Sequence, residues 1–348
     1  MNKTERRKEE HITIALEKNV AAHHNAWDAV FLPHNALPEV DQHDIDLSTR
    51  LFGKNLGAPL LISGMTGGFA RGKDINDNLA ATAEKFKIGL GVGSQRAALE
   101  NPKLKATYDV ITSYSLPLKI ANIGASQIVL WDKKKVVEYA QQIIDMIDAD
   151  VLAVCLNFLQ EAVQPEGEAH AKGCLETITM LGNELSVPLI VKESGAGISM
   201  STAQSLMTTP IAGIDIGGAG GTSFAAVEYY RADMKGDRHN MRMGKTFWDW
   251  GIPTPSSLMQ VLRVTKATMP LIATGGIRNG LDAAKAIAMG ADIAGIAHAM
   301  LAPATRSKED AMFELEVILK ELQTAMFLVG AGSVEELSCV DVYYDVEN

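Results

Sequence analysis

The chain has 348 residues, of which 47% are hydrophobic and 21% charged, and its formal net charge is −10. This length suffices for one large barrel, and the acidic balance argues against nucleic acid as a partner. Three cysteines without metal-type spacing are typical of a reducing compartment, and no apolar run approaches the roughly 18 residues of a membrane helix. The basic N-terminus lacks the apolar stretch of a signal peptide. We therefore expect a cytoplasmic protein without membrane or nucleic-acid partners.

Residues 1–55 precede a repeating pattern that begins near Pro59. Thr4–Leu16 is expected to be a helix with a basic face. Such a face is commonly a solvated helix end, so charge alone leaves its role open. The remainder up to Leu56 has turn residues and little periodicity. We predict a single domain, in which residues 1–55 form an arm or cap over a barrel of residues 56–348.

From Pro59 onward the chain alternates short apolar runs with amphipathic segments. The runs are rich in Val, Ile, Leu and Ala, as expected for parallel strands covered on both faces. The predicted strands are Pro59–Ser63, Ile88–Gly91, Leu118–Asn122, Val151–Leu156, Pro188–Lys192, Gly213–Ile216, Leu271–Ala273 and Ile293–Ile296. The predicted helices are Ile75–Phe86, Lys133–Ile147, Leu175–Leu185, Ser201–Met207, Pro255–Ala267, Leu281–Met289 and Lys308–Leu328.

Eight strands alternating with helices predict an α/β fold, specifically a (β/α)₈ TIM barrel with an N-terminal extension. The irregular piece is Glu228–Pro253, between the sixth and seventh strands, which is rich in Arg, Asp, Met and Trp. We predict that it is a long, mobile loop over the mouth of the barrel.

Chemistry in this fold collects at the carboxyl ends of the strands. Glycine-rich turns follow the first, sixth and seventh strands, at Gly64–Gly68, Gly217–Ser223 and Thr274–Gly276. Each alone is compatible with a simple tight turn, but bare amides at a strand-to-helix turn also bind phosphate. Lys192 ends the fifth strand, where an unpaired ammonium is costly to bury. With Asn122, it suits the polar edge of a flavin ring, so we predict a phosphorylated cofactor.

Three polar side chains follow the fourth strand, namely Asn157, Gln160 and Glu161. Glu161 is compatible with three roles: a ligand of a hard cation, a general acid or base, and a plain surface carboxylate. Mg²⁺ often binds through one or two carboxylates together with substrate phosphates. The residues alone leave these roles open.

With these features assembled, the chain resembles the type 2, FMN-dependent isopentenyl-diphosphate isomerases over nearly its whole length. The specific combination is the N-terminal Arg-Lys-x-x-His with Leu-Asn-x-x-Gln-Glu, since TGGIR alone also fits other FMN or phosphate barrels. The motifs are RKEEHI (Arg7–Ile12), SGMTGG (Ser63–Gly68), GVGSQR (Gly91–Arg96), ANIGA (Ala121–Ala125), LNFLQEAVQPEG (Leu156–Gly167), VKESGAGIS (Val191–Ser199), GGAGGTSFAAVE (Gly217–Glu228) and IAHAML (Ile296–Leu301).

The resemblance implies reversible isomerisation of isopentenyl diphosphate to dimethylallyl diphosphate with reduced FMN and Mg²⁺, NADPH as flavin reductant, and a homotetramer or homooctamer. It implies Gln160 and Glu161 as the reacting residues, with Glu161 also binding the metal. The implied substrate contacts are Arg7, Lys8, His11, Ser94, Gln95, Arg96, Asn157 and Gln160. The implied FMN contacts are Met65, Thr66, Gly67, Ser94, Asn122, Lys192, Thr222, Gly275, Gly276, Ile277, Arg278, Ala297 and His298.

One position departs from the family pattern, because Cys155 stands where many members have His. A thiol is a much weaker hydrogen-bonding partner, which affects the expected rate and proton route. The alternatives are another FMN-dependent barrel oxidoreductase of the hydroxyacid-oxidase kind, a dehydrogenase of the IMP-dehydrogenase kind, and a flavin-binding protein without catalysis. The oxidases need a strand-end His with paired Arg, and the dehydrogenases a nucleophilic Cys on a loop. No cysteine directly follows the sixth strand.

Overall fold

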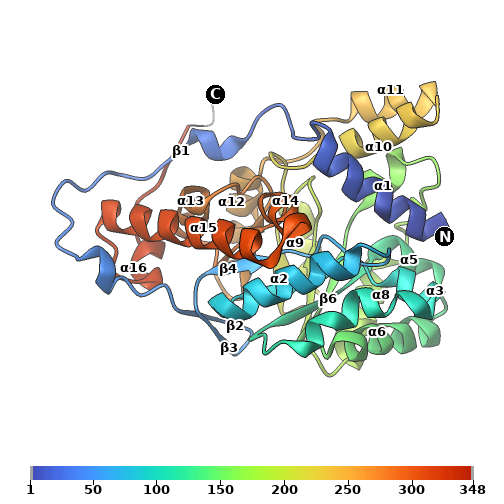
Figure 1. Cartoon of the computed structure of the whole chain (residues 1–348), viewed down its shortest axis with the longest axis horizontal. Coiled ribbons are helices and arrows are strands. Elements are labelled where there is room, and N and C mark those ends of the chain that lie inside the picture. The colour runs from blue at the N-terminus through green and yellow to red at the C-terminus, as the bar shows by residue number, and fades with distance from the viewer. Residues whose placement is uncertain (1–2, 346–348) are drawn as a thin grey trace.

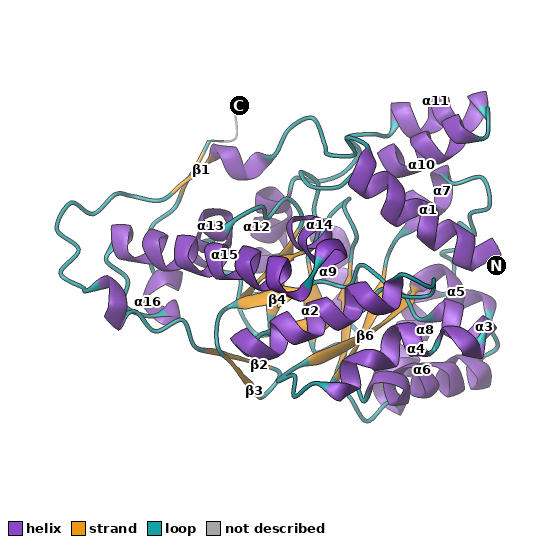
Figure 2. Ribbon diagram, viewed as in Figure 1, coloured by secondary structure: helices purple, strands orange, loops and turns teal. Residues whose placement is uncertain are grey.

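A computed structural model describes residues 3–345. Eight parallel strands close into a barrel in chain order, with the last strand pairing back onto the first. The barrel strands are β4 (Leu60–Ile62), β5 (Gly89–Gly91), β6 (Lys119–Gly124), β7 (Val151–Cys155), β8 (Leu189–Lys192), β9 (Gly213–Asp215), β10 (Leu271–Thr274) and β11 (Ile293–Ile296). They lie at the centre of Figure 2, surrounded by helices. The predicted TIM barrel and all eight strands are confirmed.

Helices cover the outside of the barrel (Figure 1). Apolar side chains at helical spacing pack onto the buried strands, as in Leu79 and Ala83 of the helix after β4. The helices are α1 (Lys3–Glu17), α2 (Gly72–Phe86), α3 (Arg96–Glu100), α4 (Ala106–Asp109), α5 (Ala125–Leu130), α6 (Lys133–Ile147), α7 (Phe158–Val163), α8 (Cys174–Glu184), α9 (Met200–Leu206), α10 (Phe224–Met234), α11 (Arg238–Thr246), α12 (Thr254–Thr265), α13 (Gly280–Ala288), α14 (His298–Arg306), α15 (Lys308–Val329) and α16 (Val334–Ser338). Every helix predicted from the sequence is present.

The N-terminal segment covers both ends of the barrel. At the carboxyl ends of the strands, α1 lies against α10 (Figure 1). At the opposite end, the hairpin of β2 (Thr49–Leu51) and β3 (Lys54–Leu56) packs with residues from the starts of the barrel strands. Between them, the 3₁₀-helix η1 (Ala26–Ala29) leads into β1 (Val30–Phe31), which pairs with β12 (Tyr343–Tyr344). The segment expected as an arm or cap thus also closes the floor of the barrel.

The prediction of a long irregular loop at Glu228–Pro253 is wrong, because most of this segment is helical. Helices α10 and α11 pack against each other, and Gly244 allows their close contact, since a Cβ there would lie 2.8 Å from the Tyr229 Cβ. The helical period was hidden because Glu228 and Arg231, which are charged, point into the protein rather than into solvent. Only the connections on either side of α11 remain irregular.

Within residues 3–345, no helix has both the length and the apolar character needed to cross a bilayer.

Candidate active site

A cavity of about 880 Å³ opens at the carboxyl ends of the barrel strands and extends beneath α1. It brings together residues that lie almost 300 positions apart, from Arg7 to His298. The predicted site residues that line it are Arg7, Lys8, His11, Met65, Gly67, Ser94, Arg96, Asn122, Asn157, Gln160, Glu161, Lys192, Thr222, Gly275, Gly276, Ile277, Arg278, Ala297 and His298.

Two predicted residues, Thr66 and Gln95, do not line the cavity. The Thr66 hydroxyl bonds to Asn76 in the core. The Gln95 amide donates to the Ile143 carbonyl (2.9 Å), and its oxygen accepts the Asn122 N–H (3.1 Å). Both side chains are buried and support the cavity wall from behind. Only their backbone remains for the predicted contacts.

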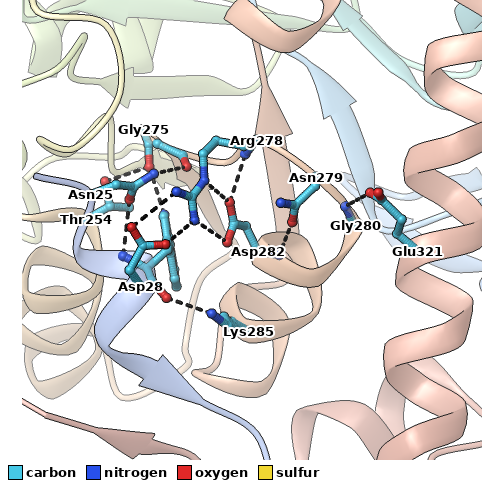
Figure 3. A network of polar contacts seen from close by, with 12 residues as sticks. Asn25, Asp28, Thr254, Gly275, Arg278, Asn279, Gly280, Asp282, Lys285 and Glu321 are labelled. Atoms are coloured by element: carbon cyan, nitrogen blue, oxygen red, sulfur yellow. Dashed lines mark hydrogen bonds and ion pairs between the residues drawn. The ribbon is translucent and has the colours of Figure 1, made fainter. Parts of the chain in front are cut away.

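The loop after β10 forms a cradle of backbone amides, and Figure 3 shows Gly275 and Arg278 of this loop with the residues around them. Gly275 and Gly276 have φ of +104° and +73°, a region that strongly favours glycine. A Cβ on Gly275 would lie 2.2 Å from the Gly218 carbonyl oxygen, so the loop also has no room for one. The amides of Gly276 and Ile277 face no acceptor among residues 3–345. Next to this loop, α14 begins after β11, and a helix N-terminus also favours an anion.

The arginine of this loop is not free to bind a ligand. Arg278 Nε donates to Asp282 (2.8 Å), and its terminal nitrogens pair with Asp28 from the arm. These two carboxylates hold the Arg278 pKa above its ordinary value, so the group stays charged but is neutralised. The cradle therefore presents amides rather than a free cation.

A second polar group lies on the cavity floor, at the ends of β6, β7 and β8. Lys192 Nζ donates to the Glu193 carbonyl (2.9 Å) and lies 3.8 Å from Cys155 Sγ. Burial lowers the Lys192 pKa, but Cys155 and the carboxylates of Asp215 and Glu193 outweigh it and raise the pKa overall. Burial also raises the Cys155 pKa.

The floor also carries an unpartnered acceptor. Asn122 is 6% exposed, and its Oδ1 has no hydrogen-bond partner among the described residues. A buried oxygen without a partner is costly, which indicates that a bound group satisfies it. Amides for a phosphate, an ammonium and a vacant amide oxygen together fit the phosphate and polar ring edge of FMN.

Helices α1 and α3 contribute basic side chains to the cavity wall. Lys8 Nζ donates to the Ser94 carbonyl (2.7 Å), and burial together with the neighbouring Arg7 lowers the Lys8 pKa to about 7. Arg96 pairs with Glu100 (2.6 Å) and Glu168. Arg7 makes no ion pair with any residue from 3 to 345. Arg7 is thus the cation most available to an anionic ligand.

A buried ion cluster, which the sequence analysis missed, holds α1 in place. Arg231 of α10 pairs with Glu228 (2.6 Å), Glu10 (3.0 Å) and Glu166, and His11 Nε2 lies 2.8 Å from Glu228. Burial raises the Glu228 pKa, but His11 and Arg231 outweigh it and keep it below its ordinary value. The signal in the sequence was the i,i+3 spacing of Glu228 and Arg231 within an otherwise apolar stretch.

Glu161 is the strongest candidate for a metal ligand. It is 5% exposed but lines the cavity, and its Oε1 accepts from Asn157 Nδ2 (3.0 Å). Its Oε2 accepts from Gln164 Nε2 (2.6 Å) and from the Glu168 N–H (2.8 Å). These donors fix the orientation of the carboxylate, as hydrogen-bonding partners of a metal ligand do. A single carboxylate is compatible with a magnesium site, because Mg²⁺ commonly takes its other ligands from phosphate groups and water.

The chain is 48% identical over 334 residues to the isopentenyl-diphosphate delta-isomerase of Thermoplasma volcanium, covering 96% of this chain and 94% of that protein. The enzyme of the same name from Methanosarcina mazei is 44% identical over 340 residues, covering 97% and 91%. This chain belongs to the isopentenyl-diphosphate delta-isomerase family. It is therefore an isomerase, as the resemblance predicted.

The cofactor class has independent support. Residues 159–342 match the model of the FMN-dependent dehydrogenase family, a stretch that contains the cradle and Lys192. The solved structure of mandelate oxidase with (S)-2-phenylpropionate has a TM-score of 0.66 and 15% identity, covering 98% of this chain and 97% of that one. At that identity the likeness concerns the fold alone. The chain thus carries an FMN-dependent dehydrogenase region within its barrel.

Proposed function

We propose that the chain converts isopentenyl diphosphate reversibly into dimethylallyl diphosphate, using reduced FMN and Mg²⁺. The observation that carries this proposal is the presence of two different anion sites in one cavity. The amide cradle at Gly276 and Ile277 suits the single phosphate of a cofactor. The cations of α1 and α3 suit a diphosphate. The family name supplies the reaction class.

The proposed FMN site combines the cradle with the cavity floor. The amides of Gly276 and Ile277 and the start of α14 hold the phosphate. Asn122 and Lys192 hold the polar ring edge, where a cation stabilises negative charge on the ring. The remaining contacts proposed from the sequence line the same cavity, except Thr66. When bound, reduced FMN supplies an electron-rich ring able to give and take a proton.

The proposed substrate site lies under α1. Arg7, Lys8, His11 and Arg96 surround the place where charge-assisted contacts to a diphosphate form. Arg96 exchanges one of its carboxylate partners for the diphosphate, whereas Arg7 is free to bind at once. Mg²⁺ on Glu161 neutralises the remaining diphosphate charge.

The double-bond shift needs a proton added at one carbon and another removed nearby, without net oxidation. We propose Gln160 and Glu161 as the protein groups beside the reacting carbons, with Glu161 mainly holding the metal. Gln160 makes no side-chain hydrogen bond to another described residue, so its amide is free to orient the substrate. Positioning a short substrate by its diphosphate supplies much of the catalysis in such a site.

The direct experiment is to purify the chain, look for bound flavin, reduce it without oxygen, add Mg²⁺ and isopentenyl diphosphate, and identify the product by NMR. Dimethylallyl diphosphate is the expected product. NADPH, the proposed physiological reductant, is tested against dithionite in the same assay, and light scattering tests the proposed homotetramer or homooctamer. A cytoplasmic location is likewise part of the proposal.

Two other outcomes correspond to the alternatives. A protein that binds FMN but leaves the substrate unchanged is a non-catalytic flavin protein, the alternative motivated by Cys155. A protein that oxidises 2-hydroxy acids is an oxidoreductase of the hydroxyacid-oxidase kind. Either result contradicts the proposed reaction while leaving the fold intact.

A further inference from the structure

We propose that Asn25 and Trp27 of the N-terminal arm are positioning residues for the phosphate of FMN. They bind the carbonyls of the cradle and thereby aim its amides into the cavity. This inference rests on the proposed FMN site, and it assigns a function to a stretch of the arm that carries no predicted site residue.

The arm meets the cradle through two hydrogen bonds that do not involve the ligand. Asn25 Nδ2 donates to the Gly276 carbonyl (2.7 Å), and Trp27 Nε1 donates to the Gly275 carbonyl (2.9 Å). Figure 3 shows Asn25 beside Gly275 at one end of this network. Thr254 Oγ1 also donates to the Gly275 carbonyl (2.9 Å). Both carbonyls of the glycine pair are therefore fixed from the side of the arm and α12.

The orientation of these two carbonyls determines the orientation of the Gly276 and Ile277 amides, which we propose bind the phosphate. The Gly275 carbonyl shares a peptide plane with the Gly276 N–H, and the Gly276 carbonyl shares one with the Ile277 N–H. In a planar trans peptide the C=O and N–H point in opposite directions. Holding the two oxygens toward the arm turns the two N–H groups away from it. Neither of these two amides has an acceptor among the described residues.

The glycines make this support necessary. Each has a positive φ, and glycine crosses between backbone regions more readily than any other residue. Without Asn25 the Gly276 carbonyl loses its donor, and without Trp27 the Gly275 carbonyl keeps only Thr254, so both peptide planes rotate more readily. A rotated plane presents a carbonyl oxygen to the phosphate instead of an N–H. One such rotation converts an attraction into a repulsion.

The arm segment is itself held rigidly. Trp27 is fully buried, and its carbonyl accepts from Lys285 Nζ of α13 (2.7 Å). Asn25 also caps η1, with its Oδ1 accepting the Trp27 N–H (3.1 Å). Asp28 pairs with Arg278 at the other end of the loop. A segment anchored in this way is able to hold the glycine pair in one conformation.

Two substitutions remove one donor each and keep the fold of the arm. Trp27→Phe retains a buried ring but has no N–H. Asn25→Ser retains an oxygen that caps η1, since Ser is a good N-cap, but loses the amide donor. Gln42→Ala is the matched control, because Gln42 joins the arm to Thr324 of α15 (2.9 Å) and does not line the cavity.

The measurement is the dissociation constant of flavin from the flavin-free protein, followed by quenching of flavin fluorescence, with FMN and with riboflavin. Riboflavin lacks the phosphate. We expect Trp27→Phe and Asn25→Ser each to weaken FMN about tenfold, the size of one lost hydrogen bond, while riboflavin changes by less than about twofold. Gln42→Ala leaves both constants unchanged.

Equal affinity for FMN in both variants and wild type would overturn the inference. An equal loss for FMN and riboflavin would also overturn it, because general loosening of the arm explains that result without the phosphate. A wild-type protein that binds neither flavin would instead contradict the proposed cofactor site, so the two failures are distinguishable.

Discussion

The cavity presents two physically different kinds of group to an anion. At the cradle, the groups are neutral backbone amides, and the nearby Arg278 is already paired with Asp28 and Asp282. Under α1, the groups are charged side chains, of which Arg7 has no partner among residues 3–345 and Lys8 has a pKa of about 7. The first site is built into strand ends and loops. The second is brought to the barrel by the arm.

The difference matches the two ligands that we propose. Amides do not titrate and need no counter-ion, which suits a cofactor phosphate that stays bound over many turnovers. Side-chain cations bind a more highly charged diphosphate, and their strength depends on pH and on neighbouring charges. We therefore expect changes at one site to leave the affinity of the other largely intact.

The largest effect is expected on turnover, from a substitution of Glu161, which we propose holds Mg²⁺ beside the reacting carbons. Glu161→Gln keeps the hydrogen-bonding shape but removes the charge that holds Mg²⁺. Turnover should fall on the order of 10²–10³-fold, and its dependence on Mg²⁺ should weaken. Steady-state rates over a magnesium titration measure both. Glu176→Gln, in the exposed pair with Lys133, is the control. Unchanged turnover and unchanged magnesium dependence would rule out Glu161 as the metal ligand.

The next largest effect is expected on the free energy of unfolding, when the buried ion cluster around Arg231 loses its arginine. Arg231→Met leaves Glu10, Glu166 and Glu228 close together without their shared cation, and breaking such a buried group costs about 3 kcal/mol. Denaturant unfolding measures the loss. Arg306→Met, in an exposed pair with Asp310, should change stability by less than about 0.5 kcal/mol. Similar stability for the two variants would contradict the account of how α1 is held.

Removing the free cation tests the separation of the sites. Arg7→Met should raise the KM for isopentenyl diphosphate on the order of 10–100-fold, since hydrogen bonds to charged groups contribute more than neutral ones. The dissociation constant of FMN should stay within about twofold. Kinetics and flavin fluorescence give the two numbers. Loss of FMN affinity of the same size would show that the sites are not separate.

The smallest effect is a pH dependence confined to the substrate site. Lys8 is protonated below pH 7, so the affinity for the diphosphate is highest there. Above pH 7 the affinity falls as pH rises, because Lys8 must take up a proton when the diphosphate binds. The loss should approach but not exceed about tenfold per pH unit above 7. Calorimetry in two buffers measures the proton uptake, and Lys8→Met should abolish that component. FMN affinity should show no such slope. Equal slopes for wild type and Lys8→Met would exclude Lys8 as the titrating group.

Much of the fold could be predicted from the sequence. The eight apolar runs lie within two residues of the strands, because parallel strands buried on both faces need continuous apolar residues, as in Val151–Cys155. Most predicted site residues also converge, because strand ends meet at one face of a barrel. The failure was the predicted loop that contains most of α10 and all of α11, and in α10 Glu228 and Arg231 are buried as partners rather than exposed. Pairing of this kind depends on residues far away, such as Glu10.

The support for the site could not be predicted. Asn25 and Trp27 lie in a stretch without periodicity, and their partners are backbone carbonyls 248 or more residues away. Every residue has a backbone carbonyl, so the sequence does not show which carbonyls accept hydrogen bonds from side chains. Gln95 shows the converse, because its place in a motif suggested a ligand contact, whereas its side-chain amide bonds to the core. A motif locates a site more reliably than it assigns each side chain.

The most direct test is to measure FMN affinity and the KM for isopentenyl diphosphate, at saturating FMN, in both Trp27→Phe and Arg7→Met. We predict that Trp27→Phe weakens FMN binding and leaves the KM for isopentenyl diphosphate unchanged. We predict that Arg7→Met leaves FMN affinity unchanged and raises that KM. Variants in which both constants change together, or in which the two losses are exchanged, would contradict the assignment of the cradle to the cofactor and of the cations to the substrate.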